Sequence, residues 1–260
     1  AQAIQLDAIA ASKYVANIST GTVADLKTLT TNRGVNTNEF DITVTDTTAS
    51  AADLNTINTK TASAVSLGNV TTVNGSRTDL ATLYAANGST VTGLGNEAIT
   101  VSDANITSAQ ANTIDAYTTG AVTATISTTA IGDLDDLTGT GNAYTITVAT
   151  AQVTAAALNT VNAATTVNVT ATAVTQITGS AAELATTFGG GITGLGGETI
   201  ILTDTTLAAA TLTPTVNGYS SVAINANSVT TLTGTNTEIL AAYTAETDSD
   251  VILDGEAKLT

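Results

Sequence analysis

The sequence lacks the side chains on which most enzyme sites are built. Its 260 residues include no histidine, cysteine, methionine or tryptophan, and only one proline. Without cysteine there are no disulfides, no thiolate nucleophiles and no sulfur ligands for zinc. Without histidine, the usual general base near neutral pH and the commonest metal ligand are missing too. These absences predict that the chain is not an enzyme.

Positive charge is also scarce, with six lysines and arginines against 22 aspartates and glutamates and a formal net charge of −16. Five of the six cations lie in the first third of the chain: Lys13, Lys27, Arg33, Lys60 and Arg77. Nucleic-acid phosphates and anionic membranes both attract clustered cations. The uncharged stretch 137–182 is interrupted by Thr, Asn and Gln, unlike a membrane span. We therefore predict neither nucleic-acid binding nor membrane insertion.

One short motif recurs five times and organises the whole chain. It reads glycine, a capping residue, two free positions, an acid, and then leucine or isoleucine. Its glycines are Gly21, Gly75, Gly132, Gly179 and Gly234. The period is roughly 53 residues, near the upper end of known repeat lengths. Because the capping residue and the acid three residues later both satisfy amides of a first helical turn, each copy predicts the start of a helix.

A second motif lies between successive glycine motifs and predicts another helix. Its copies are Leu54-Asn55-Thr56-Ile57, Ala111-Asn112-Thr113-Ile114, Leu158-Asn159-Thr160-Val161 and the degraded Leu212-Thr213-Pro214-Thr215-Val216. Ser50 and Asp53 form a further predicted capping box in front of the first copy. Pro214 is expected to break its helix. Two helix starts per unit divide the period into halves of roughly 26 residues.

Short β-branched runs separate these helices and predict strands. One set covers 42–45, 99–101, 145–148 and 200–203, and another covers 69–73, 173–177 and 228–232. Strands that alternate with helices favour parallel pairing. The predicted fold is an α/β solenoid, with coils of roughly 26 residues paired into units of roughly 53 and a parallel sheet along one side. A parallel β-helix is the alternative.

We expect one repeat domain over residues 1–260. The predicted units are 1–37, 38–89, 90–141, 142–191 and 192–247, followed by a C-terminal tail at 248–260. Tyr84, Phe188 and Tyr243 occupy matching places after the glycine motif. We expect these rings to fill space beneath the helices rather than to bind a ligand.

Acidic residues flank equivalent predicted strands. The pairs are Glu39 with Asp46, Glu97 with Asp103, and Glu198 with Asp204. Carboxylates stacked on adjacent coils would repel unless a hard cation lay between them, which makes Ca²⁺ a possible ligand. Turn formation is the alternative role for such aspartates, and the unit 142–191 has Asn142 and Ala149 instead. A weaker candidate metal cluster is Asp248, Asp250 and Asp254, whose alternative is a solvated chain end. No other cofactor is expected.

Several segments resemble the tandem repeats of very large surface proteins of marine bacteria, especially unicellular cyanobacteria. The resemblance rests on Ala52-Asp53-Leu54-Asn55-Thr56-Ile57, on residues 92–103, and on Val229-Thr230-Thr231-Leu232-Thr233-Gly234-Thr235. It covers about Asn38 to Tyr243. Those proteins are acidic, Thr-rich and cysteine-free. The resemblance implies export and a place at the cell surface or outside the cell, but no catalytic or ligand residue can be transferred.

Two functions follow as hypotheses. The first is a non-enzymatic structural protein of the cell surface, a filament or a coat such as a surface layer, in which the chain associates with further copies of itself. The second is an adhesin segment whose Thr- and Asn-rich surface binds a glycan. A polysaccharide-cleaving β-helix enzyme is a distant third, since it would usually carry aromatic and basic residues along its groove, and this chain has few of either.

Overall fold

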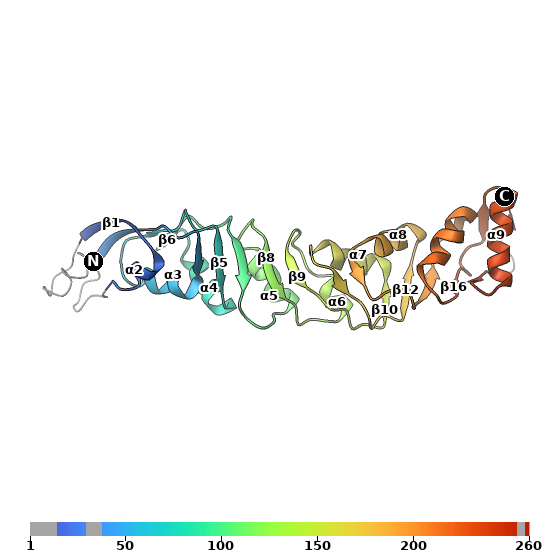
Figure 1. The fold of residues 1–260 in the computed structure, drawn as a ribbon, viewed down its shortest axis with the longest axis horizontal. Coiled ribbons are helices and arrows are strands. Elements are labelled where there is room, and N and C mark those ends of the chain that lie inside the picture. The colour runs from blue at the N-terminus through green and yellow to red at the C-terminus, as the bar shows by residue number, and fades with distance from the viewer. Residues whose placement is uncertain (1–14, 30–37, 254–257, 260) are drawn as a thin grey trace. The chain divides into compact units, whose positions relative to one another are not determined.

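The computed structural model describes residues 15–29, 38–253 and 258–259 (Figure 1). The chain divides into two compact units, residues 1–106 with 110–125 and residues 107–109 with 126–260. Each unit alternates short parallel strands with short helices, as the α/β prediction requires. The border between the units falls inside the predicted repeat 90–141, and the single repeat domain stays a prediction.

The first unit holds most of the elements up to Thr125. Its strands are β1 (Val15–Gly21), β2 (Glu39–Val44), β3 (Thr48–Ser50), β4 (Val65–Ser66), β5 (Thr72–Gly75), β6 (Val91–Thr92), β7 (Ala98–Val101) and β8 (Val122–Thr125). Its helices are α2 (Val23–Leu26), α3 (Ala51–Asn58), α4 (Arg77–Ala86) and, from Gln110 onward, α5 (Ser108–Asp115).

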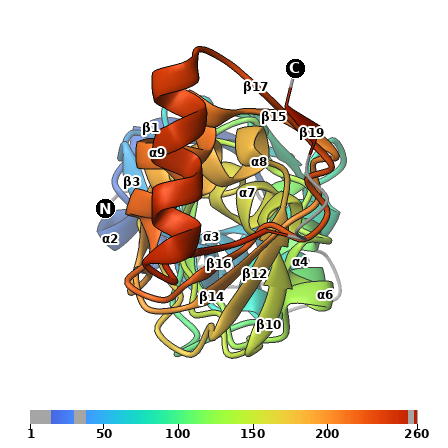
Figure 2. The ribbon, with the colours of Figure 1, turned by 90° about the vertical axis from the view of Figure 1, so that its right-hand side faces the viewer.

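The second unit continues the alternation. Its strands are β9 (Ala143–Thr145), β10 (Gln152–Thr154), β11 (Val169–Thr170), β12 (Gln176–Gly179), β13 (Ile192–Thr193), β14 (Thr199–Leu202), β15 (Thr206–Ala208), β16 (Ile224–Asn225), β17 (Thr231–Thr233), β18 (Val251–Ile252) and β19 (Lys258–Leu259). Its helical segments are α6 (Ile131–Leu134), α7 (Ala155–Ala163), α8 (Ala181–Gly189), η1 (Thr211–Val216), η2 (Asn217–Tyr219) and α9 (Asn236–Thr247). Figure 2 shows α9 in front of β14 and β16.

Every strand pairing described within either unit is parallel. The first unit contains the sheet β1-β2-β4-β6 and the ladder β3-β5-β7-β8. The second contains β10-β12-β14-β16-β18, β11-β13 and β15-β17-β19. Paired strands are separated in sequence by a helical segment, the connection that parallel pairing requires.

The parallel register stacks apolar side chains into a core. Val73 lies opposite Ile99 in the first unit, and Ile177 lies opposite Ile200 in the second, all with 0% exposure. Burial of one such side chain stabilises the fold by roughly 1.5–3 kcal/mol. The helices close the other side of this core through residues such as Leu80. The alternation of apolar and polar residues is used as expected in the strands predicted at 42–45, 99–101 and 200–203. The strand predicted at 145–148 is wrong in its bounds, because β9 covers Ala143–Thr145.

Most predicted helix starts are confirmed. The side chains of Thr22, Ser76, Ser180 and Thr235 each accept a hydrogen bond from the backbone amide three residues later, and Ser50 does the same for α3. The third copy was predicted wrongly. There α6 begins at Ile131 after Ala130, which makes no side-chain cap, so that Gly132 and Asp133 lie inside the helix.

Strands in front of the glycine motifs start later than predicted. The amides of Val70, Val174 and Val229 donate to carbonyls three residues earlier, at distances of 2.9, 3.1 and 2.9 Å. These bonds close tight turns, and the strands β5, β12 and β17 begin only at Thr72, Gln176 and Thr231. The sequence pattern placed the strand starts too early, because a valine that is buried in a turn cannot be distinguished in sequence from a valine that is buried in a strand.

The predicted break at Pro214 is confirmed. Thr213, the residue before it, has φ −130° and ψ 126°, an extended conformation that interrupts the helical segment η1. Within the part of the chain that the structure describes, every helix is too short or too polar to cross a lipid bilayer.

Candidate functional site

The three aspartates that follow predicted strands bind the protein's own backbone. Asp46 accepts from the amide of Val23 at 2.7 Å, Asp103 from Arg77 at 2.6 Å, and Asp204 from Ala181 at 2.8 Å. Each donor is the first residue of a helix that lies 23 to 26 residues earlier in the sequence. Each of these aspartates therefore ties one strand-and-helix segment to the segment before it.

These contacts complete the helix N-termini. A helix leaves four backbone amides without partners inside the helix, and its N-terminus carries partial positive charge. The capping hydroxyl binds one of these amides, and the aspartate of the next segment binds another. At two other helices a hydroxyl takes the same role: Thr150 of the unit 142–191 accepts from Ile131 at 2.9 Å, and Thr128 accepts from Ser108 at 3.1 Å. Thr150 directly follows Ala149, the residue that the sequence comparison placed at the position of the aspartates.

Two of the predicted glutamates are buried and close a glycine loop. Glu97 and Glu198 are each 1% exposed. Glu97 Oε2 accepts from the amides of Gly95 at 2.8 Å and Asn96 at 3.1 Å. Glu198 accepts in the same way from Gly196 and Gly197, at 2.8 and 3.0 Å. Since a buried carboxylate needs such donors to offset its desolvation, both glutamates are structural parts of their loops.

Glycine is required in these loops for two separate reasons. Gly95 and Gly196 have φ of 130° and 124°, a region that other residues rarely adopt. Gly93 also has positive φ, and a Cβ there would lie 2.7 Å from the amide nitrogen of Gly68. The Gly-x-Gly-x-Glu pattern that the sequence repeats is thus a folding requirement of the loop.

Stacked aromatic rings lie beside both loops. Tyr84 stacks on Tyr117 with centroids 4.8 Å apart, and Phe188 stacks on Tyr219 with centroids 4.6 Å apart. The Tyr84 hydroxyl donates to Glu97 Oε1. Burial, together with this bond to a carboxylate, raises the pKa of Tyr84 well above its ordinary value. Phe188 occupies the matching place but has no hydroxyl to donate.

Glu39 does not occupy the place of Glu97. It is the half-buried first residue of β2. When the strands are aligned on the capping residues Asp46 and Asp103, Phe40 takes the position of Glu97, and Phe40 is 2% exposed. The corresponding residue of the unit 142–191 is Tyr144, which is 1% exposed. The position therefore holds either an aromatic ring or a carboxylate bound by amides.

The structure describes two of the three acids of the weaker candidate metal cluster. Asp248 is exposed at the end of α9, and Asp250 is exposed just before β18, while Asp254 lies outside the described residues. Among the described residues, no group of three or more acids is close enough to hold a metal ion. Calcium binding by the predicted acids stays a prediction.

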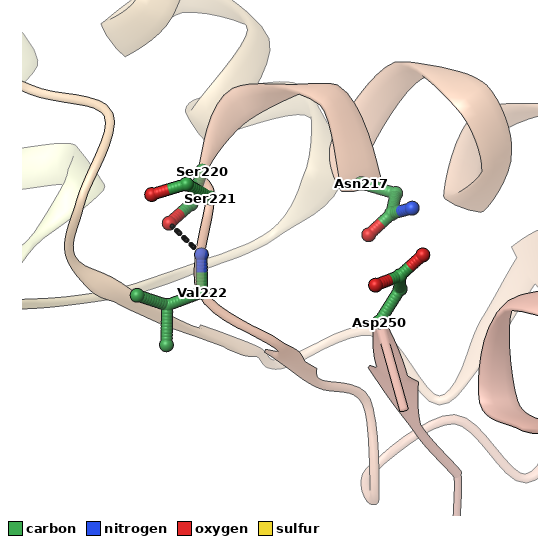
Figure 3. Close-up of a pocket in the computed structure, with 5 residues that line it drawn as sticks. All are labelled: Asn217, Ser220, Ser221, Val222 and Asp250. Carbon is green, nitrogen blue, oxygen red and sulfur yellow. Dashed lines mark hydrogen bonds between the residues drawn. The ribbon is translucent and has the colours of Figure 1, made fainter. Parts of the chain in front are cut away.

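A small polar pocket lies beside Asp250 (Figure 3). It is lined by Asn217, Ser220, Ser221, Val222 and Asp250, and its volume is about 190 Å³. The side chains of Asn217 and Asp250 face one another across it. The Ser220 hydroxyl accepts from the Val222 amide at 3.1 Å and donates to the Glu198 carbonyl at 2.6 Å. The pocket is smaller than the ~300–1,000 Å³ of drug-sized ligand sites and offers hydrogen bonds to a small polar group.

Sequence reasoning missed a repeated set of Thr and Ser hydroxyls that bridge two segments, called clips below. Each clip binds the backbone of the preceding segment and also accepts from the amide two residues later. Each lies 14 residues before an anchor glycine: Thr61 before Gly75, Thr118 before Gly132, Thr165 before Gly179, and Ser220 before Gly234. That constant spacing is a signal that could have identified them.

Two asparagines form a further set of ties between helices. Asn55 Nδ2 donates to the carbonyl of Asp79 at 2.9 Å, and Asn159 Nδ2 donates to that of Glu183 at 2.9 Å. Both asparagines belong to the second repeated motif, and both bonds join consecutive helices within one unit. The motif was predicted as a helix, but its asparagine was given no role.

Comparison with known proteins provides no identification. No protein-family model, no curated protein and no solved structure matches this chain. The resemblance to surface repeats therefore stays a prediction, and function has to be inferred from the chain's own geometry.

Proposed function

We propose that the chain is a non-enzymatic structural protein of the cell surface, or of an extracellular filament or coat, built as an α/β solenoid. The observation that carries this proposal is the recurrent tie between consecutive segments, in which Asp46, Asp103 and Asp204 accept from the first amide of the preceding helix. A contact of this kind lets one coil stack on the next and be repeated without limit.

The polar side chains support the same role because they join neighbouring strand-and-helix segments. The asparagine bonds of Asn55 and Asn159 connect neighbouring helices, and the clips at Thr61 and Thr165 connect neighbouring segments. Carboxylates that would be candidates for catalysis, Glu97 and Glu198, are buried and bound to backbone amides. Each coil acts mainly as the support of its neighbour.

Negative-stain microscopy of the concentrated protein tests this function, with calcium and then with excess chelator. Ordered filaments or sheets are the expected result. If the assemblies dissolve on chelation, calcium bound by Asp46, Asp103, Asp204 or neighbouring acids is needed to hold them together. Assemblies that ignore the chelator would retain the structural role without calcium. Particles that stay single in both conditions would count against the structural role.

A second candidate is adhesion to a surface glycan, which the pocket beside Asp250 favours. Its amide, hydroxyl and carboxylate groups can hydrogen-bond to sugar hydroxyls. A glycan array probed with the chain and with Asp250→Ala tests it, with Asp248→Ala as the matched control. Binding lost only in Asp250→Ala would support adhesion at this pocket. Equal binding, or none, would reject it.

A further inference from the structure

We infer that Asn217 is a site of spontaneous deamidation, which converts its side-chain amide into a carboxylate that faces Asp250. Asparagine followed by glycine is the sequence most prone to this reaction, because glycine has no Cβ to hinder the approach of its own backbone nitrogen. The chain contains three such pairs, all among the described residues: Asn74-Gly75, Asn87-Gly88 and Asn217-Gly218. The structure distinguishes the three pairs by the contacts that hold each of them.

The reaction needs water and no other reagent. The backbone nitrogen of Gly218 gives up its proton and attacks the side-chain carbonyl carbon, Cγ, of Asn217, which forms a new C–N bond. The bond from Cγ to Nδ2 breaks, and Nδ2 takes up the proton and leaves as ammonia, so that a five-membered succinimide ring remains. Water then opens the ring at either carbonyl and leaves aspartate or isoaspartate at this position.

The side chain of Asn217 is free to react. Its amide makes no hydrogen bond with any residue that the structure describes, and it lines the polar pocket, where water can reach it (Figure 3). A Cβ built on Gly218 would meet no atom within 4 Å, so the backbone of the attacking residue is uncrowded. Both reacting groups are therefore accessible.

The backbone around Asn217 can reach the reactive conformation through a small local change. Asn217 has φ −60° and ψ −26°, and ψ must rotate before the nitrogen of the next residue can face Cγ. η2 ends at Tyr219, and Ser220 is already extended, with φ −134° and ψ 150°. Because helix ends fray, the rotation opens only this last turn. The site precedes α9 in the chain, and the adjoining segment η1 contacts both α8 and α9.

Asn87 is held where Asn217 is not. Its Nδ2 donates to the carbonyl of Leu94 at 3.2 Å. The amide of Gly88, which would be the nucleophile, donates to the carbonyl of Val91 at 2.8 Å. Both bonds must break before the ring can close, which slows the reaction at Asn87 by roughly tenfold.

Asn74 is held by its strand. It lies on β5, which pairs with β3 on one side and with β7 on the other. A Cβ on Gly75 would lie 2.9 Å from the Cβ of Ala51, so the backbone of this pair is tightly enclosed. Ring closure at Asn74 would require the ladder to open, and this pair should also react slowly.

Deamidation changes what the pocket beside Asp250 offers to a ligand. Before the reaction, Asn217 presents an amide and Asp250 presents a carboxylate from the facing side. After the reaction, two carboxylates share the pocket and the side-chain N–H donors of Asn217 are gone. The pocket of an aged chain is thus more negative than that of a new one.

Peptide mapping of the folded full chain, incubated at mildly alkaline pH, tests the inference. Mass spectrometry detects the exchange of NH for O at each asparagine, and digestion in heavy-oxygen water separates conversion during incubation from conversion during digestion. We expect Asn217 to convert at least about tenfold faster than Asn87 or Asn74. In guanidinium the three sites should convert at similar rates, because the contacts that distinguish them are lost.

Gly218→Ala is the matched variant, because the added methyl group meets no atom within 4 Å. It should suppress most of the conversion at Asn217 and leave the rate at Asn87 unchanged. Circular dichroism should show that this variant folds like the parent chain. An Asn217 that stays intact in the folded chain, equal rates at the three sites of the folded chain, or a Gly218→Ala variant that converts like the parent would overturn the inference. A denatured chain with the same preference for Asn217 would overturn it too, since the fold would then not be the cause.

Discussion

At the residue scale, single carboxylates of this chain act on backbone amides of another segment. Asp103 is the clearest example, because its bond to Arg77 completes the N-terminus of α4. Removing it leaves an unsatisfied amide and takes a negative charge away from the positive end of the helix. The resulting loss is one of folding stability, and it can be measured on single substitutions.

We expect Asp103→Ala to lower the free energy of unfolding by about 1–2 kcal/mol, the usual cost of losing a helix cap. Urea unfolding followed by circular dichroism measures it. Asp41→Ala, an exposed aspartate of β2, is the control and should change stability by less than about 0.5 kcal/mol. Equal effects of the two substitutions would mean that the Asp103 contact does not stabilise the fold.

Tyr84→Phe should lower the free energy of unfolding by roughly 1–2 kcal/mol, since the hydroxyl donates to the buried carboxylate of Glu97. Tyr219→Phe is the matched control. It keeps a stacked ring, and its hydroxyl has no partner among the described residues. Indistinguishable unfolding curves for the two variants would exclude a stabilising role for the Tyr84 hydroxyl.

The same bond predicts alkaline sensitivity. The pKa of Tyr84 is raised in the folded chain by burial and by Glu97. Its contribution to stability is therefore complete below the ordinary tyrosine pKa of about 10 and is lost as the pH rises above it. Thermal unfolding of the parent chain across that range should show a steeper decline than that of Tyr84→Phe. Parallel declines would contradict this assignment.

At the element scale, the capping boxes of α8 and α9 make the free energy of unfolding depend on pH in the acidic range. Hydrogen bonds from the backbone amide and the hydroxyl of Ser180 hold the pKa of Glu183 below its ordinary value, and Thr235 does the same for Glu238. A carboxyl whose pKa is lowered by folding stabilises the fold above its unfolded pKa. That contribution is lost as the pH falls through the folded value.

We therefore expect the parent chain to lose stability as the pH drops below about 4.5, the unfolded value for Glu183. Glu183→Gln should be less stable at neutral pH and show a flatter decline in acid. Glu246→Gln serves as the control on α9, since it lies outside the capping box. Unfolding midpoints of the parent chain and both variants are measured across this pH range. If the midpoint of Glu183→Gln falls with pH as steeply as that of the parent chain, the Glu183 capping box does not cause the acid sensitivity.

The elements could be predicted from the sequence where the signal is local. A hydroxyl, two free positions and an acid identify a helix start because all the groups involved lie within one turn. The third copy misled because Gly132 and Asp133 imitate the pattern, while the helix actually begins earlier, at Ile131. The strands that begin at Thr72, Gln176 and Thr231 were predicted to begin earlier, because buried positions in turns and in strands favour the same apolar residues.

The partners of the acids could not be predicted, because they are set by contacts between segments. The positions of Asp46, Asp103 and Asp204 were identified, but their oxygens bind amides 23 to 26 residues earlier. Only the stacking register brings those amides within reach. The ring pairs, such as Tyr84 with Tyr117, were likewise assigned to space filling without their stacking partners.

At the scale of the whole molecule, both units use one construction. Each contains parallel strands, a glycine loop closed by a buried glutamate, a stacked ring pair, and at least one aspartate that caps an earlier helix. The central claim is that consecutive segments stack in one parallel register.

Disulfide trapping tests that claim most directly, because the chain has no cysteine of its own. Thr48 and Thr72 are register partners on β3 and β5, and neighbouring strands lie about 4.8 Å apart, within disulfide reach. The combination Thr48→Cys with Thr72→Cys should cross-link readily under mild oxidation. Thr48→Cys with Thr100→Cys, one strand further along the ladder, should not. Failure of the first pair, or equal yields from both, would contradict the stacked register.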